Sequence, residues 1–411
     1  TVLLLGFSSG LPLALTGATL AVWLTESGID LKSIGLFALI GVPYTFKFVW
    51  APLVDHLRLP LLTRAFGRRR AWMLATQAAL IAALLGLGAS DPAADIGTVA
   101  ILALVVAFCS ASQDIVIDAY RVEILEQEQY GAGAAAVQFG YRLAMLTSGA
   151  GALFLAQYSE SWAVTYAVMA ALVGVGMVTV LVNREPKAPA LPPKAPGVAG
   201  WARHAVLDPF LDMARRQGMM IVAVLAFVLL YKLGDAFAGV MANPFYIKMG
   251  FTKAEIASIS KVFGFGATIA GTFLGGVLVA RYGIVKSLLA CGVLQMLSNL
   301  MFAWQATVGH DIGALTLTIA VENLSGGMGS AAFVAYMSGL CSLSYTGTQY
   351  ALLSSLAAVG RTLVASSAGA LAQSVGWVDF FVVSTIVAVP GIVLLAVLRR
   401  RLVEGPVAAP A

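Results

Sequence analysis

Long apolar runs recur along the whole chain and limit the folds that it can adopt. Each run has about 20 residues, the length that an α-helix needs to cross a hydrocarbon core of roughly 30 Å. A helix also satisfies its own backbone hydrogen bonds in lipid. The predicted spans number twelve and cover residues 1–24, 33–54, 71–89, 97–121, 131–156, 163–182, 219–242, 254–280, 286–305, 313–338, 346–372 and 379–398.

The composition is that of a polytopic membrane protein. Hydrophobic residues make up 60% of the 411 residues, charged residues make up 11%, and the mean hydropathy is +0.89. Soluble domains contain about 25% charged residues. We therefore expect an all-α integral membrane protein.

Lysine and arginine are distributed unevenly between the predicted loops. If the N-terminus is cytoplasmic, the cytoplasmic loops and tail hold sixteen of the 25 lysines and arginines, and the opposite loops hold three. The positive-inside rule then predicts that both termini are cytoplasmic. The net charge of +5 reflects this topology, so we expect the lipid bilayer and no nucleic acid as a partner.

A proline-rich segment divides the predicted spans into two groups of six. The stretch NREPKAPALPPKAPGVAG is polar and disfavours a helix. It predicts an N-terminal six-helix bundle at 1–183, a cytoplasmic linker at 184–218, and a C-terminal six-helix bundle with a short tail at 219–411. The second part of the linker, WARHAVLDPFLDMARRQG, is amphipathic, which favours an interfacial helix or a simple helical tether.

The two halves resemble each other in sequence. GYRLAMLTSGAGAL in the fifth predicted span aligns with VGRTLVASSAGALA in the eleventh. This alignment pairs Arg142 with Arg361 and Ser148 with Ser367, both at a separation of 219 residues. Two six-span repeats are the plan of major facilitator transporters, and we expect that fold.

Charged residues deep in the predicted spans are costly, at roughly 2.5 to 3.5 kcal/mol each on insertion scales, and usually face a cavity or a partner. The third, sixth, ninth and twelfth spans carry no deep charge, and in the major facilitator fold these are the outer helices. The deep charges are Lys47, Asp114, Asp118, Arg142, Lys232, Asp235, Lys261, Glu322 and Arg361. We expect most of them to line a cavity, whereas Lys261 can reach the outer interface.

Two of these charges, Asp114 and Asp118, lie four residues apart in SQDIVIDAYRVEIL, on one face of the fourth span. Two nearby carboxylates in a low dielectric resist simultaneous ionisation, so one of them can carry a proton. We predict proton coupling here, with Asp114 favoured. Glu322 and Asp235 are the candidates in the second half. Glu123 projects about half a turn away, so we expect it at the water-facing helix end and outside the site.

Structural ion pairing is the alternative interpretation of the same charges. Asp114 would then pair with Arg142 or Lys47, and Asp118 with Arg121. Lys232 and Asp235, three residues apart in the seventh span, could likewise neutralise each other.

A cytoplasmic gate is predicted after the second span. In facilitators an acid at this helix end meets basic residues of the next loop when the cytoplasmic side closes. Here Asp55 is followed by Arg68, Arg69 and Arg70, and Arg121 lies at the cytoplasmic end of the fourth span. The spacing is longer than in the compact facilitator pattern, and positive-inside anchoring is the alternative explanation of the arginines.

The sequence contains no catalytic or metal-binding constellation. It has no G-x-x-x-x-G-K-[ST] loop, which argues against ATP-driven transport by the chain itself. The histidines all lie in predicted loops and the cysteines lie singly: His56, His204, His310, Cys109, Cys291 and Cys341. We therefore expect no enzyme activity, no metal site and no cofactor.

Five stretches of the first half are distinctive: GFSSGLPLALTGATLAVWL, IGLFALIGVPYTFKFVWAPLVD, GRRRAWML, SQDIVIDAYRVEIL and GAGAAAVQFGYRLAML. Together they resemble the AmpG-type muropeptide permeases of Gram-negative inner membranes. The resemblance implies proton-coupled import of N-acetylglucosaminyl-1,6-anhydro-N-acetylmuramyl peptides from periplasm to cytoplasm. In that family the import serves cell-wall recycling and, in some bacteria, β-lactamase induction.

Such a substrate is an anionic glycopeptide, which requires cationic groups for its carboxylates and aromatic faces for its sugars. Each tyrosine could instead be a packing or interfacial residue. The predicted substrate-binding residues are Lys47, Tyr44, Gln113, Tyr120, Tyr141, Arg142, Tyr231, Lys232, Asn323 and Arg361. We expect the transporter to act as a monomer with this substrate and protons as its partners.

Two other functions are compatible with the sequence. PYTFKFVWAPLVD also resembles the acetyl-CoA transporter branch, whose substrate is anionic and carries nucleotide phosphates. A non-transporting assembly or sensor protein on the same fold is the other alternative.

Overall fold

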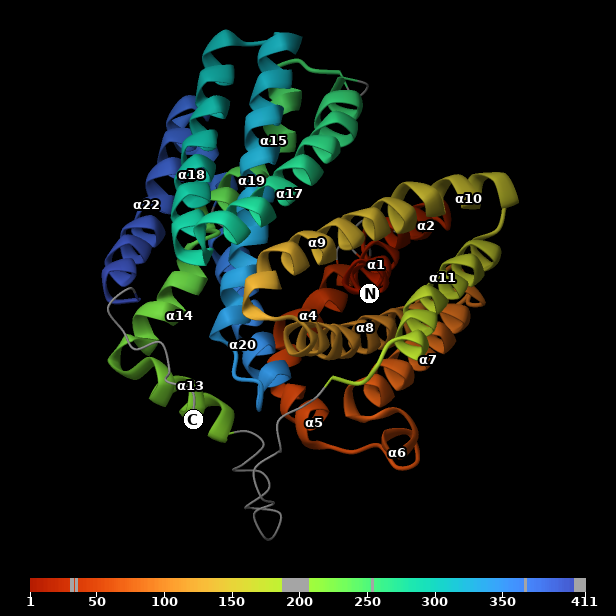
Figure 1. Ribbon diagram of the computed structural model, residues 1–411. Helices are drawn as coiled ribbons and strands as arrows, with labels where there is room; N and C mark the ends of the chain where they lie inside the picture. The colour runs from red at the N-terminus through yellow and green to blue at the C-terminus, as the bar shows by residue number, and fades with distance from the viewer. Residues whose placement is uncertain (30–32, 34–35, 187–206, 253–254, 366–367, 403–411) are drawn as a thin grey trace. The chain divides into compact units, whose positions relative to one another are not determined.

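The computed structural model describes residues 1–29, 33, 36–186, 207–252, 255–365 and 368–402. Over these residues all regular secondary structure is helical (Figure 1), which confirms the predicted all-α class. Eight of the described helices are long and apolar enough to cross a membrane, by length and composition.

The helices of the first half follow the predicted hydrophobic runs. The longest one is α8, and α7 packs along it. In order they are α1 (Val2–Thr16), α2 (Ala18–Glu26), α4 (Val42–Phe46), α5 (Ala51–His56), α6 (Leu62–Phe66), α7 (Arg68–Gly88), α8 (Ile96–Ile124), α9 (Tyr130–Leu146), α10 (Ala152–Ser159) and α11 (Trp162–Val182).

The helices of the second half begin with a short amphipathic one in the predicted linker. The helices that follow again match the hydrophobic runs. In order they are α13 (Asp208–Gln217), α14 (Ile221–Leu230), α15 (Leu233–Lys248), α17 (Gly264–Tyr282), α18 (Ile284–Val308), α19 (Ile312–Leu340), α20 (Thr346–Ala365), α21 (Ala368–Val375) and α22 (Trp377–Leu402).

Several predicted spans are interrupted rather than continuous. In the second span, Pro43 and Pro52 stand in the first turns of α4 and α5, because proline has no amide hydrogen to continue a preceding helix. Lys47 lies in the 3₁₀ turn between these helices. A π-helical turn at Thr147–Gly151 separates α9 from α10, and Lys232 lies at the break between α14 and α15. Such irregular turns often coincide with functional positions in membrane helices.

The chain divides into two compact units. Unit 1 contains Thr1–Gln127, Ala136–Asp212 and Cys341–Ser355, and unit 2 contains Glu128–Ala135, Met213–Leu340 and Leu356–Ala411. Unit 1 therefore includes the beginning of α20, and unit 2 includes the beginning of α9.

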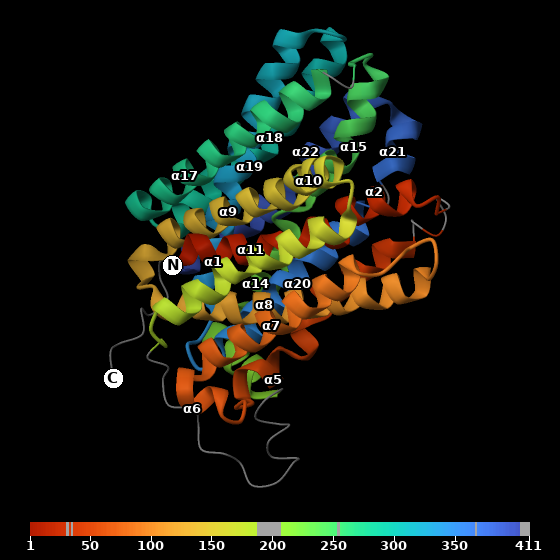
Figure 2. The same ribbon diagram turned by 90° about the vertical axis from the view of Figure 1, so that its right-hand side faces the viewer.

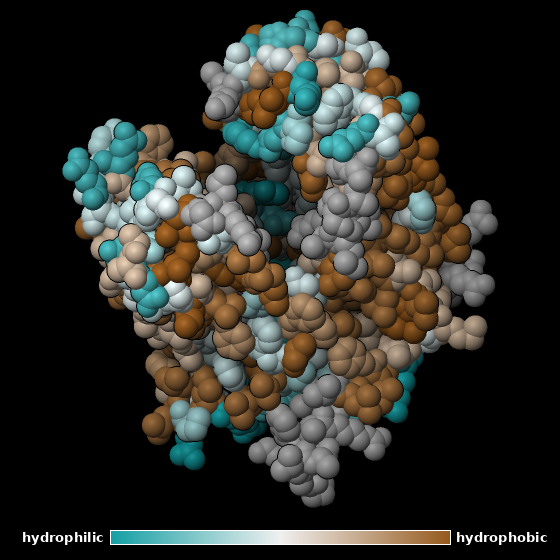
Figure 3. Space-filling view, turned by 180° about the vertical axis from the view of Figure 1, so that it is seen from behind, coloured by the Kyte–Doolittle hydropathy of each residue, from teal (hydrophilic) through white to brown (hydrophobic). Residues whose placement is uncertain are grey.

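Both units carry apolar side chains on their outsides as well as in their cores. In unit 1, Ile101 of α8 is 65% exposed and Val178 of α11 is 60% exposed; in unit 2, Val277 and Ile386 are similarly exposed. Figure 3 shows broad areas of hydrophobic side chains, with hydrophilic ones gathered toward the helix ends. Continuous exposed apolar surface of this kind is typical of helices that face lipid.

Glycine allows α1 and α9 to approach closely within unit 1. A Cβ atom at Gly140 of α9 would lie 2.0 Å from the carbonyl oxygen of Leu3, and one at Gly6 of α1 would lie 2.3 Å from that of Val137. Figure 2 shows α1 in the middle of these helices, alongside α11. Close backbone packing at small residues stabilises helix pairs in membranes, and it fixes the α1 side chains that face α8.

Candidate functional site

Asp114 lies on α8 where this helix packs against α1. The Ser9 hydroxyl of α1 donates a hydrogen bond of 2.6 Å to Asp114 Oδ1. Tyr44 of α4, whose hydroxyl is buried, and Ser110 lie beside this carboxylate. Asp114 forms no ion pair with any residue that the structure describes. Its carboxylate is therefore hydrogen-bonded to a hydroxyl group and forms no ion pair among the described residues.

Asp118, one helical turn further along α8, has a different environment. Its Oδ2 atom lies 3.8 Å from Lys47 Nζ, and its Oδ1 atom lies 3.5 Å from Arg121 Nη2. Arg121 also lies over the ring of Tyr350, with 5.1 Å between the guanidinium carbon and the ring centroid. The predicted alternative of structural pairing is thus found at Asp118, in contrast to Asp114.

The fifth span contributes Tyr141 and Arg142. Tyr141 lies near Tyr44, on the same side of unit 1 as Asp114. Arg142 is partly buried, and it makes no hydrogen bond or ion pair with another residue among those described. A half-buried arginine without a protein carboxylate is available to an anionic ligand. Its repeat partner Arg361 lies on α20, but its side chain is outside the described part of the structure.

Two other predicted substrate residues are engaged in helix packing. Gln113 is fully buried, and its amide donates to the carbonyl oxygen of Ser8 at 3.0 Å. The Tyr120 hydroxyl donates to the carbonyl oxygen of Arg184 at 2.8 Å. These contacts tie α8 to α1 and to the end of the first half of the chain.

In unit 2, Lys232 is held by several partners at the break between α14 and α15. Its Nζ atom donates to Ser330 at 3.0 Å and to Gln295 at 3.2 Å, and lies 3.6 Å from Asp235 Oδ2. The predicted Lys232–Asp235 pairing is therefore present. Sequence reasoning missed Gln295 and Ser330, because both lie more than 60 residues away along the chain.

The remaining second-half candidates lie in two places in unit 2. Tyr231 is 5% exposed, stacks on Phe333 with 5.0 Å between ring centroids, and donates to a backbone carbonyl. The Asn323 amide donates to Glu322 Oε2 at 2.7 Å, and Asn323 Oδ1 accepts a hydrogen bond of 2.7 Å from Thr268. Glu322 and Asn323 thus form a polar pair on α19, apart from the Lys232 group.

The predicted gate residues Asp55 and Arg69 form a buried ion pair. Arg69 Nη1 lies 2.7 Å from Asp55 Oδ1, and Arg69 Nη2 lies 2.5 Å from Glu123 Oε1. The expectation that Glu123 faces water is wrong: its side chain is only 1% exposed. The last turn of α8 turns Glu123 toward the start of α7, where it shares Arg69 with Asp55.

The beginning of α20 completes this cluster within unit 1 (Figure 1). Asp55 Oδ2 accepts hydrogen bonds of 2.6 Å from both the backbone amide and the hydroxyl of Thr348. The Thr346 hydroxyl donates to Glu123 at 3.1 Å. A Cβ atom at Gly347 would lie 2.6 Å from Asp55 Oδ1, so glycine is needed between the two threonines. A carboxylate at a helix N-terminus is also favoured by the helix dipole.

The other gate arginines have distinct partners. Arg68 Nη1 donates to the backbone carbonyl of Asp55 at 2.5 Å. Arg70 donates to the carbonyl oxygens of Val180 and Leu181 at the end of α11. Glu185 accepts from the backbone amides of Arg69 and Arg70 and so caps α7. We name Asp55, Arg68, Arg69, Glu123, Thr346 and Thr348 the gate cluster.

Asp55 stays ionised in this cluster. Burial alone would raise the pKa of Asp55, but Arg69, the hydrogen bond from Thr348 and Arg68 together hold the pKa below its ordinary value. The contribution of this carboxylate to stability is therefore present at neutral pH, and it is lost only as the pH falls through the lowered pKa.

Among the described residues, no three histidines, cysteines or acids lie close enough together to hold a metal ion. The site thus consists of carboxylates, hydroxyls and basic side chains. In unit 1 these run along α8, from Asp114 through Asp118 and Arg121 to Glu123. Such a row can bind anions and exchange protons.

Sequence comparison identifies relatives over nearly the whole chain. The sequence profile of the Major Facilitator Superfamily matches residues 2–243 and 228–410. The chain is 43% identical to the anhydromuropeptide permease of Escherichia coli K12, over 97% of this chain and 79% of that protein. It is 35% identical to a putative transporter, AmpG 4, of Rickettsia felis, over 97% and 96% of the two chains.

Solved structures share the fold at low sequence identity. The human organic anion transporter MFSD10 superposes with a TM-score of 0.69 at 17% identity, over 96% of this chain and 98% of that one. A double-tryptophan mutant of XylE superposes with a TM-score of 0.68 at 13% identity, over 96% and 94% of the two chains.

Proposed function

Because the chain belongs to the major facilitator superfamily, and within it to the AmpG-type permeases, we propose that it imports N-acetylglucosaminyl-1,6-anhydro-N-acetylmuramyl peptides together with protons. It is a multi-pass membrane transporter and not an enzyme. The proposed substrate rests on the 43% identity, over 97% of the chain, to a protein named anhydromuropeptide permease.

The membrane arrangement that we propose has twelve spans in two six-helix bundles, at 1–183 and 219–411, joined by the linker at 184–218. Both termini are cytoplasmic, the protein acts as a monomer, and the membrane is the inner membrane of a Gram-negative bacterium. The distribution of lysine and arginine supports the orientation.

Asp114 is the proton-coupling carboxylate in this proposal. Its only polar partner among the described side chains is the Ser9 hydroxyl, which can donate to the carboxylate and accept from the carboxylic acid. Asp118 is held between Lys47 and Arg121, at 3.8 and 3.5 Å. The two acids therefore divide the work: Asp114 exchanges the proton, and Asp118 keeps the two cations in position.

The carboxylates of the peptide are proposed to bind cations that lie within the spans. Arg142 has no competing carboxylate among the described residues, and Lys47 has one weak contact of 3.8 Å. Tyr44 and Tyr141 flank this region and supply aromatic surface for the sugar rings. Lys232 and Arg361 are the corresponding candidates in the second half.

The gate cluster is proposed to hold the cytoplasmic end closed. Asp55, Arg69 and Glu123 are buried together with Thr346 and Thr348 of α20, so the start of α20 cannot leave without exposing paired charges. Hydrogen bonds to charged groups are worth about 1.5 to 3 kcal/mol each, and departure of α20 would remove those that Thr346 and Thr348 donate. Binding of substrate and proton would have to offset a cost of this order before the cytoplasmic side opens.

Uptake into proteoliposomes tests the proposal. Purified protein should accumulate labelled anhydromuropeptide under an inward proton gradient, and a protonophore should abolish the accumulation. Excess unlabelled anhydromuropeptide should compete, whereas acetyl-CoA should not. Competition by acetyl-CoA alone would assign the chain to the acyl-CoA alternative, and absence of any gradient-dependent uptake would favour an assembly or sensor role.

A further inference from the structure

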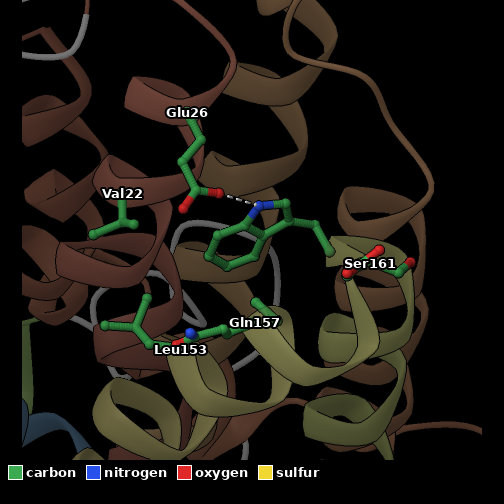
Figure 4. Close-up of a pocket in the computed structure, with 8 residues that line it drawn as sticks. Val22, Glu26, Leu153, Gln157 and Ser161 are labelled. Carbon is green, nitrogen blue, oxygen red and sulfur yellow. Dashed lines mark hydrogen bonds between the residues drawn. The ribbon is translucent and has the colours of Figure 1, made fainter.

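A surface pocket of about 470 Å³ opens at one end of unit 1, where α2, α10 and α11 meet. It is lined by Val22 and Glu26 of α2, Leu153 and Gln157 of α10, and Glu160, Ser161 and Trp162 around the start of α11 (Figure 4). α11 begins at this pocket and ends beside the gate arginine Arg70. The pocket and the gate cluster therefore lie at opposite ends of a helix roughly 30 Å long.

The indole of Trp162 is held rigidly at the pocket. Its Nε1–H group donates to Glu26 Oε2 at 2.9 Å, and its ring stacks on the buried ring of Trp23 at 5.6 Å between centroids and 19° between planes. The contact with Trp23 covers part of the indole. The aromatic ring and the apolar side chains of Val22 and Leu153 form a flat apolar wall. Because the ring is already fixed, it loses little side-chain entropy when a ligand binds.

The polar side chains around this wall have hydrogen-bonding capacity to spare. Gln157 and Glu160 make no hydrogen bond or ion pair with the rest of the described chain, and Glu26 uses only one carboxylate oxygen, toward Trp162. The pocket thus offers carboxylate oxygens as acceptors and the Gln157 amide as both donor and acceptor. No lysine or arginine is among the described residues that line it.

This combination matches a neutral sugar. A pyranose places its C–H face on an aromatic ring and its hydroxyls, which both donate and accept, on carboxylates and amides. Two glutamates with no cation among the described lining residues repel carboxylates and phosphates. The glycopeptide of the proposed function has a neutral disaccharide end and an anionic peptide end, so the pocket can accept only the first.

We propose that this pocket is an outer docking site for the N-acetylhexosamine end of the substrate. The inference rests on the proposed function, because it assumes that the end of α11 at Trp162 faces the side from which the substrate comes. The glutamates of the pocket then repel the anionic peptide end of the substrate, whereas the cations Lys47 and Arg142 attract it. The sugar is held at the entrance while the peptide carboxylates are drawn to the basic residues.

Sugar binding to the full-length protein in nanodiscs tests the proposal directly. The probe is N,N′-diacetylchitobiose, a neutral disaccharide, titrated by calorimetry. Gln157→Ala should weaken its binding about fivefold, since one hydrogen bond to a neutral group is worth about this factor. Trp162→Phe keeps a ring but loses the bond to Glu26 and should weaken binding as well. The matched control is Tyr158→Ala, which should bind like wild type. Tyr158 lies next to Gln157 on α10 and is 85% exposed, but it does not line the pocket.

Charge neutralisation separates a sugar from a cationic ligand. In the double variant Glu26→Gln and Glu160→Gln, the amides still hydrogen-bond to hydroxyls, so disaccharide binding should stay within about threefold of wild type. Tight binding of ethanolamine or Ca²⁺ to wild type that is lost in this double variant would overturn the proposal, as would disaccharide binding that Gln157→Ala and Trp162→Phe leave unchanged.

Uptake kinetics distinguish a failure of this inference from a failure of the proposed function. If the wild type transports anhydromuropeptide, Gln157→Ala should raise KM with little change in kcat, as expected for a residue of a docking site. Transport with an unchanged KM in Gln157→Ala would remove the docking site and leave the transport function intact. A wild type that does not transport anhydromuropeptide at all would refute the function itself.

Discussion

At the scale of single residues, two carboxylates one helical turn apart have different surroundings. Asp114 has a hydroxyl partner and no cation within ion-pair distance among the described residues, whereas Asp118 contacts Lys47 and Arg121. The periodicity of the sequence could place both acids on one face of α8. The sequence favoured Asp114 for proton coupling, but it could not identify the partners Ser9 and Lys47, which reach α8 from other parts of the chain.

Substitution of the two acids should affect transport differently. Asp114→Asn should reduce accumulation of anhydromuropeptide to the level reached without a proton gradient, because the amide cannot carry the proton. Asp118→Asn should retain gradient-driven uptake but lower thermal stability, because Lys47 and Arg121 lose their carboxylate. Uptake assays with and without the gradient, with melting temperatures for both variants, measure this. Wild-type accumulation by Asp114→Asn would contradict the assignment.

Arg142 should contribute to substrate affinity even in the absence of a gradient. Loss of a charge-assisted hydrogen bond predicts that Arg142→Ala weakens binding of anhydromuropeptide about tenfold or more. Binding to detergent-solubilised protein is the measurement, and Arg142→Lys, which keeps the charge, is the control. Since Arg142 has no partner among the described residues, the melting temperature should change little. Unchanged affinity together with a lower melting temperature would indicate a structural role instead.

At the scale of helices, the gate cluster depends on how closely α20 approaches α5. Gly347 sits between the two threonines that hold Asp55 and Glu123, with no room for a side chain. The sequence predicts a gate from Asp55 and the arginines that follow it. It does not predict their partners Thr346 and Thr348, since Asp55 and Thr348 are 293 positions apart and hydropathy carries no information about such pairs.

Gly347→Ala should loosen the gate cluster. The added Cβ would lie 2.6 Å from Asp55 Oδ1, so α20 or Asp55 must shift. In a background with Cys109→Ser and Cys291→Ser, a thiol reagent applied from the cytoplasmic side should label Cys341, at the start of the same unit 1 segment, faster than in the parent protein.

Gly339→Ala is the matched control for this experiment. Its Cβ would meet only an ordinary contact of 3.8 Å with Ile284, so labelling should match the parent. Equal labelling of Cys341 in the Gly347→Ala and Gly339→Ala variants would show that the close approach of α20 to Asp55 does not control access.

The remaining helices illustrate what hydropathy can and cannot predict. The spans of α7, α8, α11 and α18 are located to within a few residues, because long apolar runs have few alternatives in a membrane. The interruptions were not predicted. Pro43 and Pro52 indicate that the second span is interrupted. The break at Lys232 depends instead on Gln295 and Ser330, which bind the lysine from other helices.

At the scale of the whole molecule, the linker helix α13 is joined to the gate segment through one buried glutamine. Gln349 accepts from the backbone amide of Ser342 at 2.7 Å and donates to Pro209 and to Asp212 of α13 at 2.8 and 2.9 Å. The sequence predicted an amphipathic helix here but not its attachment. The linker is therefore docked at Pro209 and Asp212 in unit 1.

Gln349→Ala should release α13 from this attachment. Loss of the two hydrogen bonds to Pro209 and Asp212, each worth about 1 kcal/mol, should expose the helix to proteolysis. Trypsin should then cut after Arg215 or Arg216 several times faster than in wild type, as followed by gel electrophoresis of the fragments. Gln373→Ala, an exposed glutamine on α21, should leave the cutting rate unchanged. A rate in Gln349→Ala equal to that control would mean that other contacts hold α13.

Each unit includes one short segment from the other half of the chain, and these two segments occupy equivalent positions in the internal repeat. Residues 128–135 join unit 2 and residues 341–355 join unit 1, and the repeat offset of 219 maps the first segment into the second. This has a consequence for biosynthesis. Asp55 is synthesised early in translation, but Thr348, which donates two hydrogen bonds to it, is synthesised 293 residues later. A chain that ends short of this point leaves unit 1 with a buried carboxylate that lacks both hydrogen bonds from Thr348.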